Sequence, residues 1–96
     1  MNVEFAPRAT TDLARIGARS RRVFGPAVAA ALETFIRATI ARLAAFPESG
    51  VRMQLRRNVW VVPLVRYPFK IFYTFDQDTI TVLPIRHAAR RAWEED

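Results

Sequence analysis

The sequence predicts an α+β fold in the order β-α-α-β-β-β, with a helical hairpin packed on one face of a small, mostly antiparallel sheet. Two observations lead to this prediction. Residues 27–46 repeat apolar side chains at three- and four-residue spacing and contain no glycine or proline. From residue 51 onward, short β-branched and aromatic runs alternate with turn residues. The length of 96 residues suits one domain with a modest core, so we expect a single domain over residues 1–96.

The N-terminal half predicts one short strand followed by the helical hairpin, over about residues 7–46. Val3–Ala6 alternates apolar and polar residues and stops at Pro7, which suits the first turn of a helix. Helical spacing of apolar residues then predicts a first helix to about Ser20 and a connection over residues 21–25. The second helix is expected to end at Phe46, because a proline and a glycine follow closely.

The remaining strands are expected over about residues 51–87, and residues 88–96 form a short tail. We predict strand pieces at 53–56 and 59–62, a strand over Phe69–Phe75, a turn at 76–78 and a last strand over Thr79–Ile85. Pro84 should disturb pairing near the end of that strand. The register of this hairpin stays open: in one alignment Ile71 shares its face with Ile85, and after a one-residue slip it shares it with Arg86.

The composition favours an acidic or polyanionic partner and gives no sign of a metal or cofactor. The net charge is +6, with fourteen arginines against one lysine. Arginine binds phosphates and carboxylates with two parallel hydrogen bonds, although a GC-rich genome would also favour its codons. The chain has no cysteine and one histidine, so we expect neither disulfides nor a metal site and assign no cofactor. With no signal peptide and no membrane-spanning apolar run, we expect a cytoplasmic protein without a membrane partner.

Cationic side chains gather near the end of the last hairpin that is remote from its turn. They are Arg66, Lys70, Arg86 and His87, with Arg90 and Arg91 close behind in the sequence. Such a cluster can hold phosphates or stabilise a developing negative charge. A lone histidine is more often an ordinary surface group. We find neither a glycine-rich phosphate loop nor a serine in a nucleophile-elbow pattern.

Several sequence motifs occur together in this chain. None of them is specific to a family alone, but their order and spacing together are. The motifs are Phe5-Ala6-Pro7-Arg8-Ala9, Ile40-Ala41-Arg42-Leu43, Phe46-Pro47-Glu48-Ser49-Gly50, Arg66-Tyr67-Pro68-Phe69-Lys70-Ile71-Phe72-Tyr73 and Ile85-Arg86-His87-Ala88-Ala89-Arg90-Arg91. With them the chain resembles the RelE/ParE superfamily of type II toxin–antitoxin toxins over nearly its whole length. The resemblance is closest to the ParE-like branch.

The resemblance implies a toxin that inhibits DNA gyrase and is neutralised by a ParD-like antitoxin in a hetero-oligomer. Antitoxins of this superfamily wrap a helix and an extended segment over the helical hairpin and the sheet. Leu13, Ile16 and Trp60 would lie on the matching surface. The gyrase-contacting residues would be Arg66, Lys70, Arg86, His87, Arg90 and Arg91.

The alternative that the resemblance implies is a RelE-like, ribosome-dependent mRNA endoribonuclease. The nucleases of the superfamily carry basic strand residues and a C-terminal tyrosine, or a Glu/His pair, for proton transfer. Here no tyrosine follows Tyr73, and only His87, with the distant Glu48, is suited to move a proton. We therefore assign no catalytic residue; His87, Arg66 and Arg86 would act only in the ribonuclease. A third reading is a nucleic-acid-binding module without toxicity.

Overall fold

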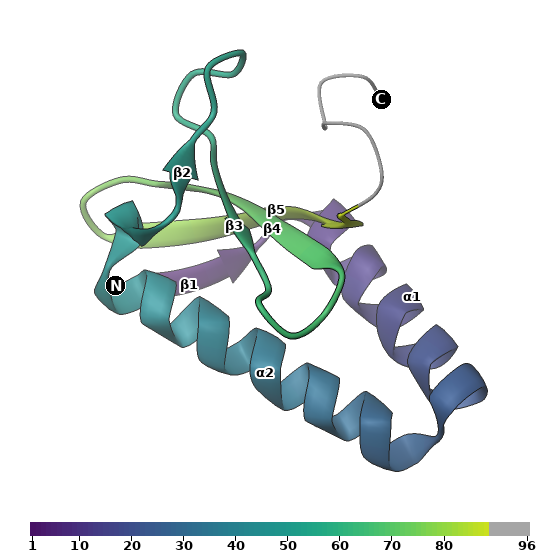
Figure 1. The fold of residues 1–96 in the computed structure, drawn as a ribbon. Coiled ribbons are helices and arrows are strands. Elements are labelled where there is room, and N and C mark those ends of the chain that lie inside the picture. Colours follow the sequence, from purple (N-terminus) through teal and green to yellow (C-terminus); the bar gives the residue numbers. More distant parts are fainter. Residues whose placement is uncertain (89–96) are drawn as a thin grey trace.

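Two helices cover one face of a five-stranded sheet in the computed structural model, which describes residues 1–88 (Figure 1). The helices are α1 (Pro7–Phe24) and α2 (Pro26–Ala45), followed by a short 3-10 helix, η1 (Pro47–Ser49). The sheet order is β1-β5-β4-β3-β2, and only the β1–β5 pair is parallel. The strands are β1 (Asn2–Phe5), β2 (Val51–Arg52), β3 (Trp60–Pro63), β4 (Phe69–Phe75) and β5 (Thr79–His87). The predicted α+β fold is confirmed. Arg90 and Arg91 lie outside the described residues.

The first helix is one turn longer than predicted, and a single residue joins it to the second. Residues 21–24 continue α1 because no helix-breaking residue occurs before Gly25. Gly25 has φ +93°, a conformation that glycine adopts without a steric penalty. Its N–H still donates to the carbonyl of Arg21 at 3.0 Å, and Pro26 starts α2 at once.

Two glycine-to-alanine substitutions in this hairpin are expected to shift stability in opposite directions. Gly25→Ala should lower the free energy of unfolding by about 1–2 kcal/mol, because a Cβ atom disfavours positive φ. Gly17→Ala, inside α1 with no atom within 4 Å of the new Cβ, should raise it by about 0.5–1 kcal/mol. Urea unfolding followed by circular dichroism measures both. A Gly25→Ala protein as stable as the original would contradict the conformational argument.

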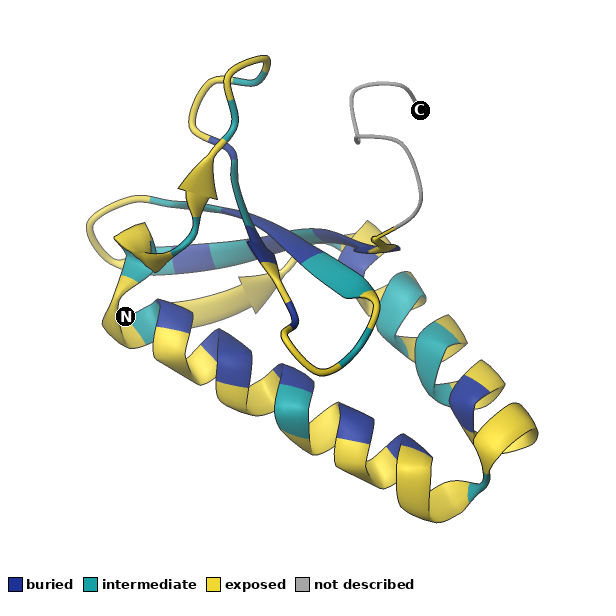
Figure 2. Cartoon of the chain, in the orientation of Figure 1, coloured by how far each residue is buried: buried dark blue, intermediate teal, exposed yellow. Residues whose placement is uncertain are grey.

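The core lies between the inner side of α2 and the helix-facing side of the sheet. The buried residues form one stripe along α2, visible in Figure 2. From the sheet, alternate residues of β4 and β5 meet this stripe, as expected for side chains that point to opposite faces in turn. The main members of the core cluster are Leu32, Ile36, Ile40, Leu43, Ile71, Tyr73, Ile80, Val82 and Ile85.

The register of the β4–β5 hairpin changes partway along its length. Near the turn Tyr73 stands opposite Val82, but two residues further Ile71 stands opposite Ile85. Leu83 and Pro84 together therefore face the single residue between Ile71 and Tyr73, which is a β-bulge. The predicted disturbance at Pro84 is confirmed, since proline cannot donate to the ladder. Both registers left open by the sequence occur, one on each side of the bulge.

The turn of this hairpin is closed by the side chain of Asp76. Its Oδ1 accepts hydrogen bonds from the N–H groups of Asp78 and Thr79, each at 2.9 Å. These two bonds favour the charged carboxylate and lower the pKa of Asp76 below its ordinary value. The stabilisation is therefore present above the ordinary aspartate pKa, and it is lost as the pH falls through the lowered value of the folded state.

The expected strand at 53–56 is wrong, because these residues belong to a loop between β2 and β3. The backbone N–H of Met53 donates to the carbonyl of Val59 at 2.8 Å, which closes the loop at its base. Leu55 is 76% exposed, so the apolar–polar alternation has no sheet face to cover. Asn58 has φ +63°, a left-handed conformation that asparagine tolerates in turns.

The hydroxyl of Tyr73 holds η1 against the sheet. It accepts a hydrogen bond from the N–H of Gly50 at 3.0 Å and donates one to the carbonyl of Pro47 at 2.7 Å. Burial raises the pKa of Tyr73, so the hydroxyl stays protonated and remains a donor.

No helix within residues 1–88 is long and apolar enough to cross a membrane.

Candidate functional site

The predicted cations alternate between the two faces at the end of the sheet, and the bulge sets which of them shares a face with Lys70. Lys70 and Arg86 stand opposite each other on β4 and β5, on the face turned away from the helices. His87 stands opposite Phe69 on the helix-covered side, with the two rings edge to face at 5.6 Å. Arg86 and His87 nevertheless line the same cleft, so the two faces meet at this end of the sheet.

On the face away from the helices, the charged groups are set into the protein surface. Arg86 is only 4% exposed, while Lys70 is half-buried. The Lys70 Nζ lies 6.0 Å from the centre of the Phe72 ring, within range of a cation–π contact. Phe72 is itself buried, so it contributes little apolar surface beside these cations.

Arg66 lies in the connection between β3 and β4 rather than in a strand. Two hydrogen bonds fold this connection back on itself, from Leu64 N–H to the Phe69 carbonyl and from Phe69 N–H to the Tyr67 carbonyl. Tyr67 anchors it by packing edge to face on Phe35 of α2 at 5.4 Å. Arg66 is exposed, and it stands at the end of the sheet where β4 begins and where His87 lies.

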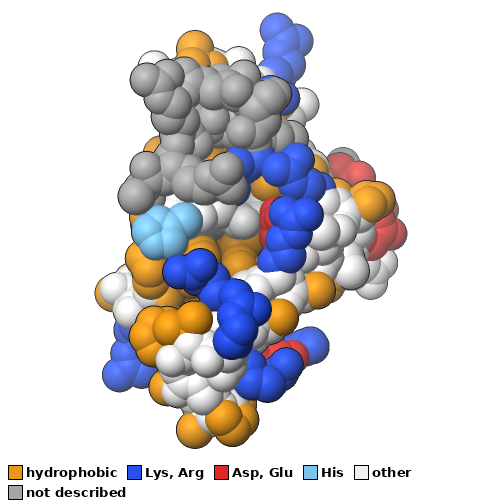
Figure 3. Space-filling view, turned by 90° about the vertical axis from the view of Figure 1, so that its right-hand side faces the viewer, with side chains coloured by type: hydrophobic (Ala, Val, Ile, Leu, Met, Phe, Trp, Pro, Cys, Tyr) orange, Lys and Arg blue, Asp and Glu red, His pale blue; other side chains and the backbone are white. Residues whose placement is uncertain are grey.

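His87 lines a cleft of about 710 Å³ between α1 and the start of β4. Across the cleft, α1 contributes Arg15 and Arg19, which are both exposed. Figure 3 shows the single histidine across an apolar floor from a row of basic side chains. Sequence reasoning missed these two arginines. The available signal was their like-charged i, i+4 spacing, which an ordinary solvated helix face avoids.

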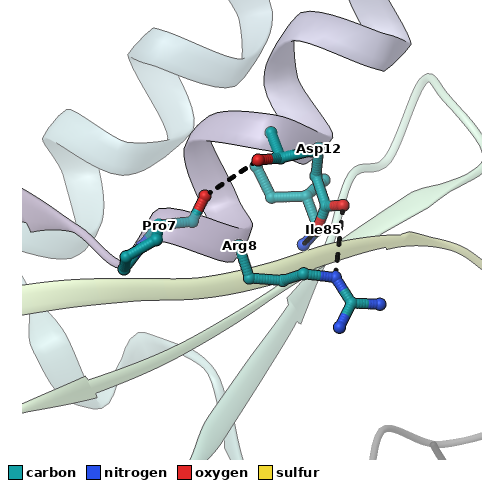
Figure 4. Close-up of polar contacts among 5 residues, drawn as sticks. Pro7, Arg8, Asp12 and Ile85 are labelled. Atoms are coloured by element: carbon teal, nitrogen blue, oxygen red, sulfur yellow. Dashed lines mark hydrogen bonds and ion pairs between the residues drawn. The ribbon is translucent and has the colours of Figure 1, made fainter.

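Asp12 fixes the distance between the two walls of this cleft (Figure 4). Its Oδ2 accepts a hydrogen bond from the backbone N–H of Ile85 at 3.0 Å, and its Oδ1 lies 3.7 Å from Arg8 Nε. Ile85 is the residue directly after the bulge. The bulged backbone thus gains an acceptor from α1, and α1 is tied to β5 at one defined point.

A second groove, of about 690 Å³, runs between α1 and α2. Leu13 and Ile16 line it together with Ala14, Gly17 and Ala30, whose small side chains leave it open. Trp60 lies on β3, within the strand expected at 59–62. Its ring packs 5.5 Å from the ring of Phe75 and 6.5 Å from that of Tyr73. Two of the three residues expected to contact an antitoxin thus share a groove, while the third lies on the sheet.

Among residues 1–88, the two groups that the sequence suggests for proton transfer, His87 and Glu48, do not meet. The Tyr73 hydroxyl is engaged by Gly50 and Pro47. Glu48 lies in η1, beside the Tyr73 end of β4, whereas His87 lies opposite Phe69. Four residues of strand separate these two places, which is about 13 Å. His87 therefore has no carboxylate partner in Glu48.

A family model described as "ParE toxin of type II toxin-antitoxin system, parDE" matches residues 3–92. The chain belongs to the ParE toxin family. A comparison of this ParE-family toxin with curated proteins finds no match. The predicted resemblance to the ParE-like branch of the RelE/ParE superfamily is thus confirmed.

Solved structures place the ParE-family chain in the RelE/ParE-like fold. The chromosomal ParDE toxin–antitoxin system from P. aeruginosa matches with a TM-score of 0.78 and 22% identity, over 91% of this chain and 95% of that one. The isolated E. coli RelE toxin matches with a TM-score of 0.60 and 15% identity, over 98% and 90%. The toxin–antitoxin complex E. coli RelBE matches with a TM-score of 0.60 and 16% identity, over 93% and 98%.

Proposed function

We propose that this ParE-family chain acts in the cytoplasm by inhibiting DNA gyrase and is held inactive by a cognate ParD-like antitoxin. The observation that carries the proposal is the ParE family match over residues 3–92. Arg66 and His87 would contact the target from the end of the sheet where β4 begins, with Lys70 and Arg86 on the adjoining face. Arg90 and Arg91, also expected to contact the target, lie outside the described residues.

A binding poison fits the site better than a hydrolase. Displacement at a phosphodiester needs a base and an acid that act on the two oxygens. Among residues 1–88, the Tyr73 hydroxyl is occupied and Glu48 is remote from His87. Arginines with an exposed imidazole suit recognition of an acidic surface and need no proton transfer.

A supercoiling assay with purified gyrase tests the proposal. The chain should inhibit supercoiling and trap cleaved DNA, and Arg66→Glu should weaken inhibition at least tenfold, because it reverses a charge on the contact surface. Arg42→Glu, on the exposed side of α2 and outside both grooves, is the matched control and should inhibit normally. Normal supercoiling at a large excess of the unaltered chain would refute gyrase inhibition.

The second candidate is the ribosome-dependent endoribonuclease, which the structural likeness to E. coli RelE favours. It predicts cleavage of ribosome-bound mRNA that is lost on His87→Ala or Arg66→Ala. Cleavage retained in both variants would remove these residues from the mechanism. Expression without an antitoxin separates both candidates from a non-toxic nucleic-acid-binding module, because a plain binder should not arrest growth.

We propose that the groove between α1 and α2 is the binding site for a helix of the antitoxin. Its floor is apolar and includes Leu13 and Ile16, and an amphipathic helix buries one apolar face in a groove of this kind. Trp60 would contact a separate, extended part of the same partner.

Ala14→Trp should fill the groove and weaken antitoxin binding at least tenfold in calorimetry. Ala38→Trp, exposed on α2 outside the groove, should bind normally; equal affinities for the two variants would exclude the groove.

A further inference from the structure

One side of α1 carries a straight row of exposed arginines. Their spacings of seven, four and three residues return each of them to the same side of the helix. From its first residue to its last, the row spans fourteen residues of helix, which is about 21 Å. We call this surface the arginine row, and its members are Arg8, Arg15, Arg19 and Arg22.

The positive charge of the arginine row is poorly balanced within α1. Asp12 is the one acidic residue of this helix, and its carboxylate already accepts a hydrogen bond from the Ile85 N–H. Arg15 and Arg19 lie four residues apart, a spacing at which like charges repel each other and destabilise a helix. An anionic partner that lies along the row would remove this repulsion.

The second helix pairs its charges in the ordinary way. Arg37 of α2 forms an ion pair with Glu33, one turn earlier, at an N–O distance of 3.0 Å. Within residues 1–88, no carboxylate forms such a pair with Arg15, Arg19 or Arg22. A codon bias toward arginine would act on both helices alike, so it does not explain the missing carboxylates beside these three residues.

The surroundings of the arginine row favour a rigid polyanion over an acidic protein or a single nucleic-acid strand. Protein interfaces are usually anchored by large side chains that become buried, and single strands stack their bases on aromatic rings. On the side turned away from β5, the exposed neighbours of the row are the small residues Thr11 and Ala18. The first aromatic residue of α1 is Phe24, beyond the end of the row.

We propose that the arginine row binds the phosphate backbone of double-stranded DNA without reading its sequence. Along one strand, phosphates follow one another at about 3.4 Å of axial rise, so a row of about 21 Å faces roughly six of them. Each guanidinium can donate two parallel hydrogen bonds to a phosphate. Arg15 and Arg19 also line the cleft that His87 lines, so DNA on the row would pass beside the surface proposed to contact gyrase. The DNA binding itself does not depend on gyrase.

Fluorescence anisotropy of a labelled DNA duplex of about 20 base pairs, roughly three times the length of the row, tests the proposal without gyrase. Each phosphate contact releases counterions, so log affinity should fall against log salt concentration with a slope of about −3 to −4. This slope lowers the affinity roughly 100-fold between about 50 and 200 mM salt, and two duplexes of unrelated sequence should bind equally. A slope near zero, or no binding at the lower salt concentration, overturns the proposal.

Two charge-matched variants locate the contact on the protein. Arg15→Ala/Arg19→Ala should weaken DNA binding at least tenfold and make the salt slope shallower by about two, because two phosphate contacts are lost. Alanine is the best helix former, and circular dichroism verifies that this variant is folded. The control Arg42→Ala/Arg57→Ala removes the same charge from exposed positions on α2 and on the β2–β3 loop, and it should bind nearly as well as the original chain. Equal losses in the two variants overturn the site, since net charge alone would then explain the binding.

Competitors separate duplex DNA from other polyanions. At equal concentration of charge, polyglutamate and a single DNA strand should displace the duplex at least tenfold less effectively, because neither presents charges on a rigid rod of such high charge density. Displacement by polyglutamate as effective as that by duplex DNA would assign the row to an acidic protein and overturn the proposal. DNA binding and inhibition of supercoiling are measured separately, so a failure of one is distinguished from a failure of the other.

Discussion

Replacing Gly50 by alanine is expected to lower the free energy of unfolding by about 3 kcal/mol. The new Cβ would lie 2.5 Å from the Tyr73 hydroxyl and 2.8 Å from the carbonyl oxygen of Val61. Neither neighbour can retreat easily: Val61 contributes backbone paired with β4, and Tyr73 is fully buried. Gly50 has φ −83°, which alanine adopts freely, so the cost is steric and not conformational.

A double-mutant cycle with Tyr73→Phe shows whether the hydroxyl is the source of this cost. Tyr73→Phe alone should lower stability by about 1–2 kcal/mol, because the Gly50 N–H and the Pro47 carbonyl both lose a partner. It also removes the nearest atom in the way of an alanine at position 50. The two substitutions together should therefore cost less than the sum of their separate effects in urea unfolding. Strict additivity would contradict the proposed clash.

Replacing Asp12 by alanine is the second large effect, with an expected loss of about 2–3 kcal/mol. The N–H of Ile85 donates to Asp12, which lies 73 residues away in the sequence. Without Asp12 this N–H would lose its acceptor, and Ile85 is buried. An unsatisfied buried donor costs more than an exposed ion pair contributes. Hydrogen exchange of the Ile85 amide should accelerate as well, since α1 would no longer hold that part of β5.

Two further substitutions identify the bond responsible. Arg8→Ala should cost no more than about 0.5 kcal/mol, because this arginine is exposed and its Nε lies 3.7 Å from Asp12. Asp12→Asn keeps an oxygen acceptor for the Ile85 N–H and should retain most of the stability. If Arg8→Ala were as harmful as Asp12→Ala, the ion pair and not the bond to β5 would hold the two elements together.

The clearest sequence signals predicted their elements well. Phe69–Phe75 was predicted with the bounds that the structure shows, because an aromatic β-branched run ends at a turn of aspartates. The end of α1 was harder to predict, since Arg21–Phe24 contains nothing that either stops or requires a helix. The alternation at 53–56 misled for a similar reason: it satisfies the strand pattern, but no neighbouring strand is placed to pair with it.

The candidate site could be predicted only in part, because its geometry depends on one bulge. The sequence places Lys70, Arg86 and His87 at one end of the hairpin, and the structure agrees. Which of them share a face depends on the extra residue on β5, and Pro84 signals a disturbance without revealing its register. Arg15 and Arg19 were not assigned to the site, because the cleft joins residues far apart in the chain and their like-charged spacing does not reveal which residues they face.

The pairing of β1 with β5 determines when during synthesis the toxin can complete its fold. Asn2 is synthesised long before its partner in the sheet, Thr79. β5 lies between β1 and β4 and also donates a hydrogen bond to Asp12 of α1, so a nascent chain that lacks β5 has no assembled sheet for its first strand or its first helix to join. Such long-range pairing also makes folding slow relative to local hairpin formation. An antitoxin present in the cell before translation ends would therefore meet the toxin at the moment its surfaces are first assembled.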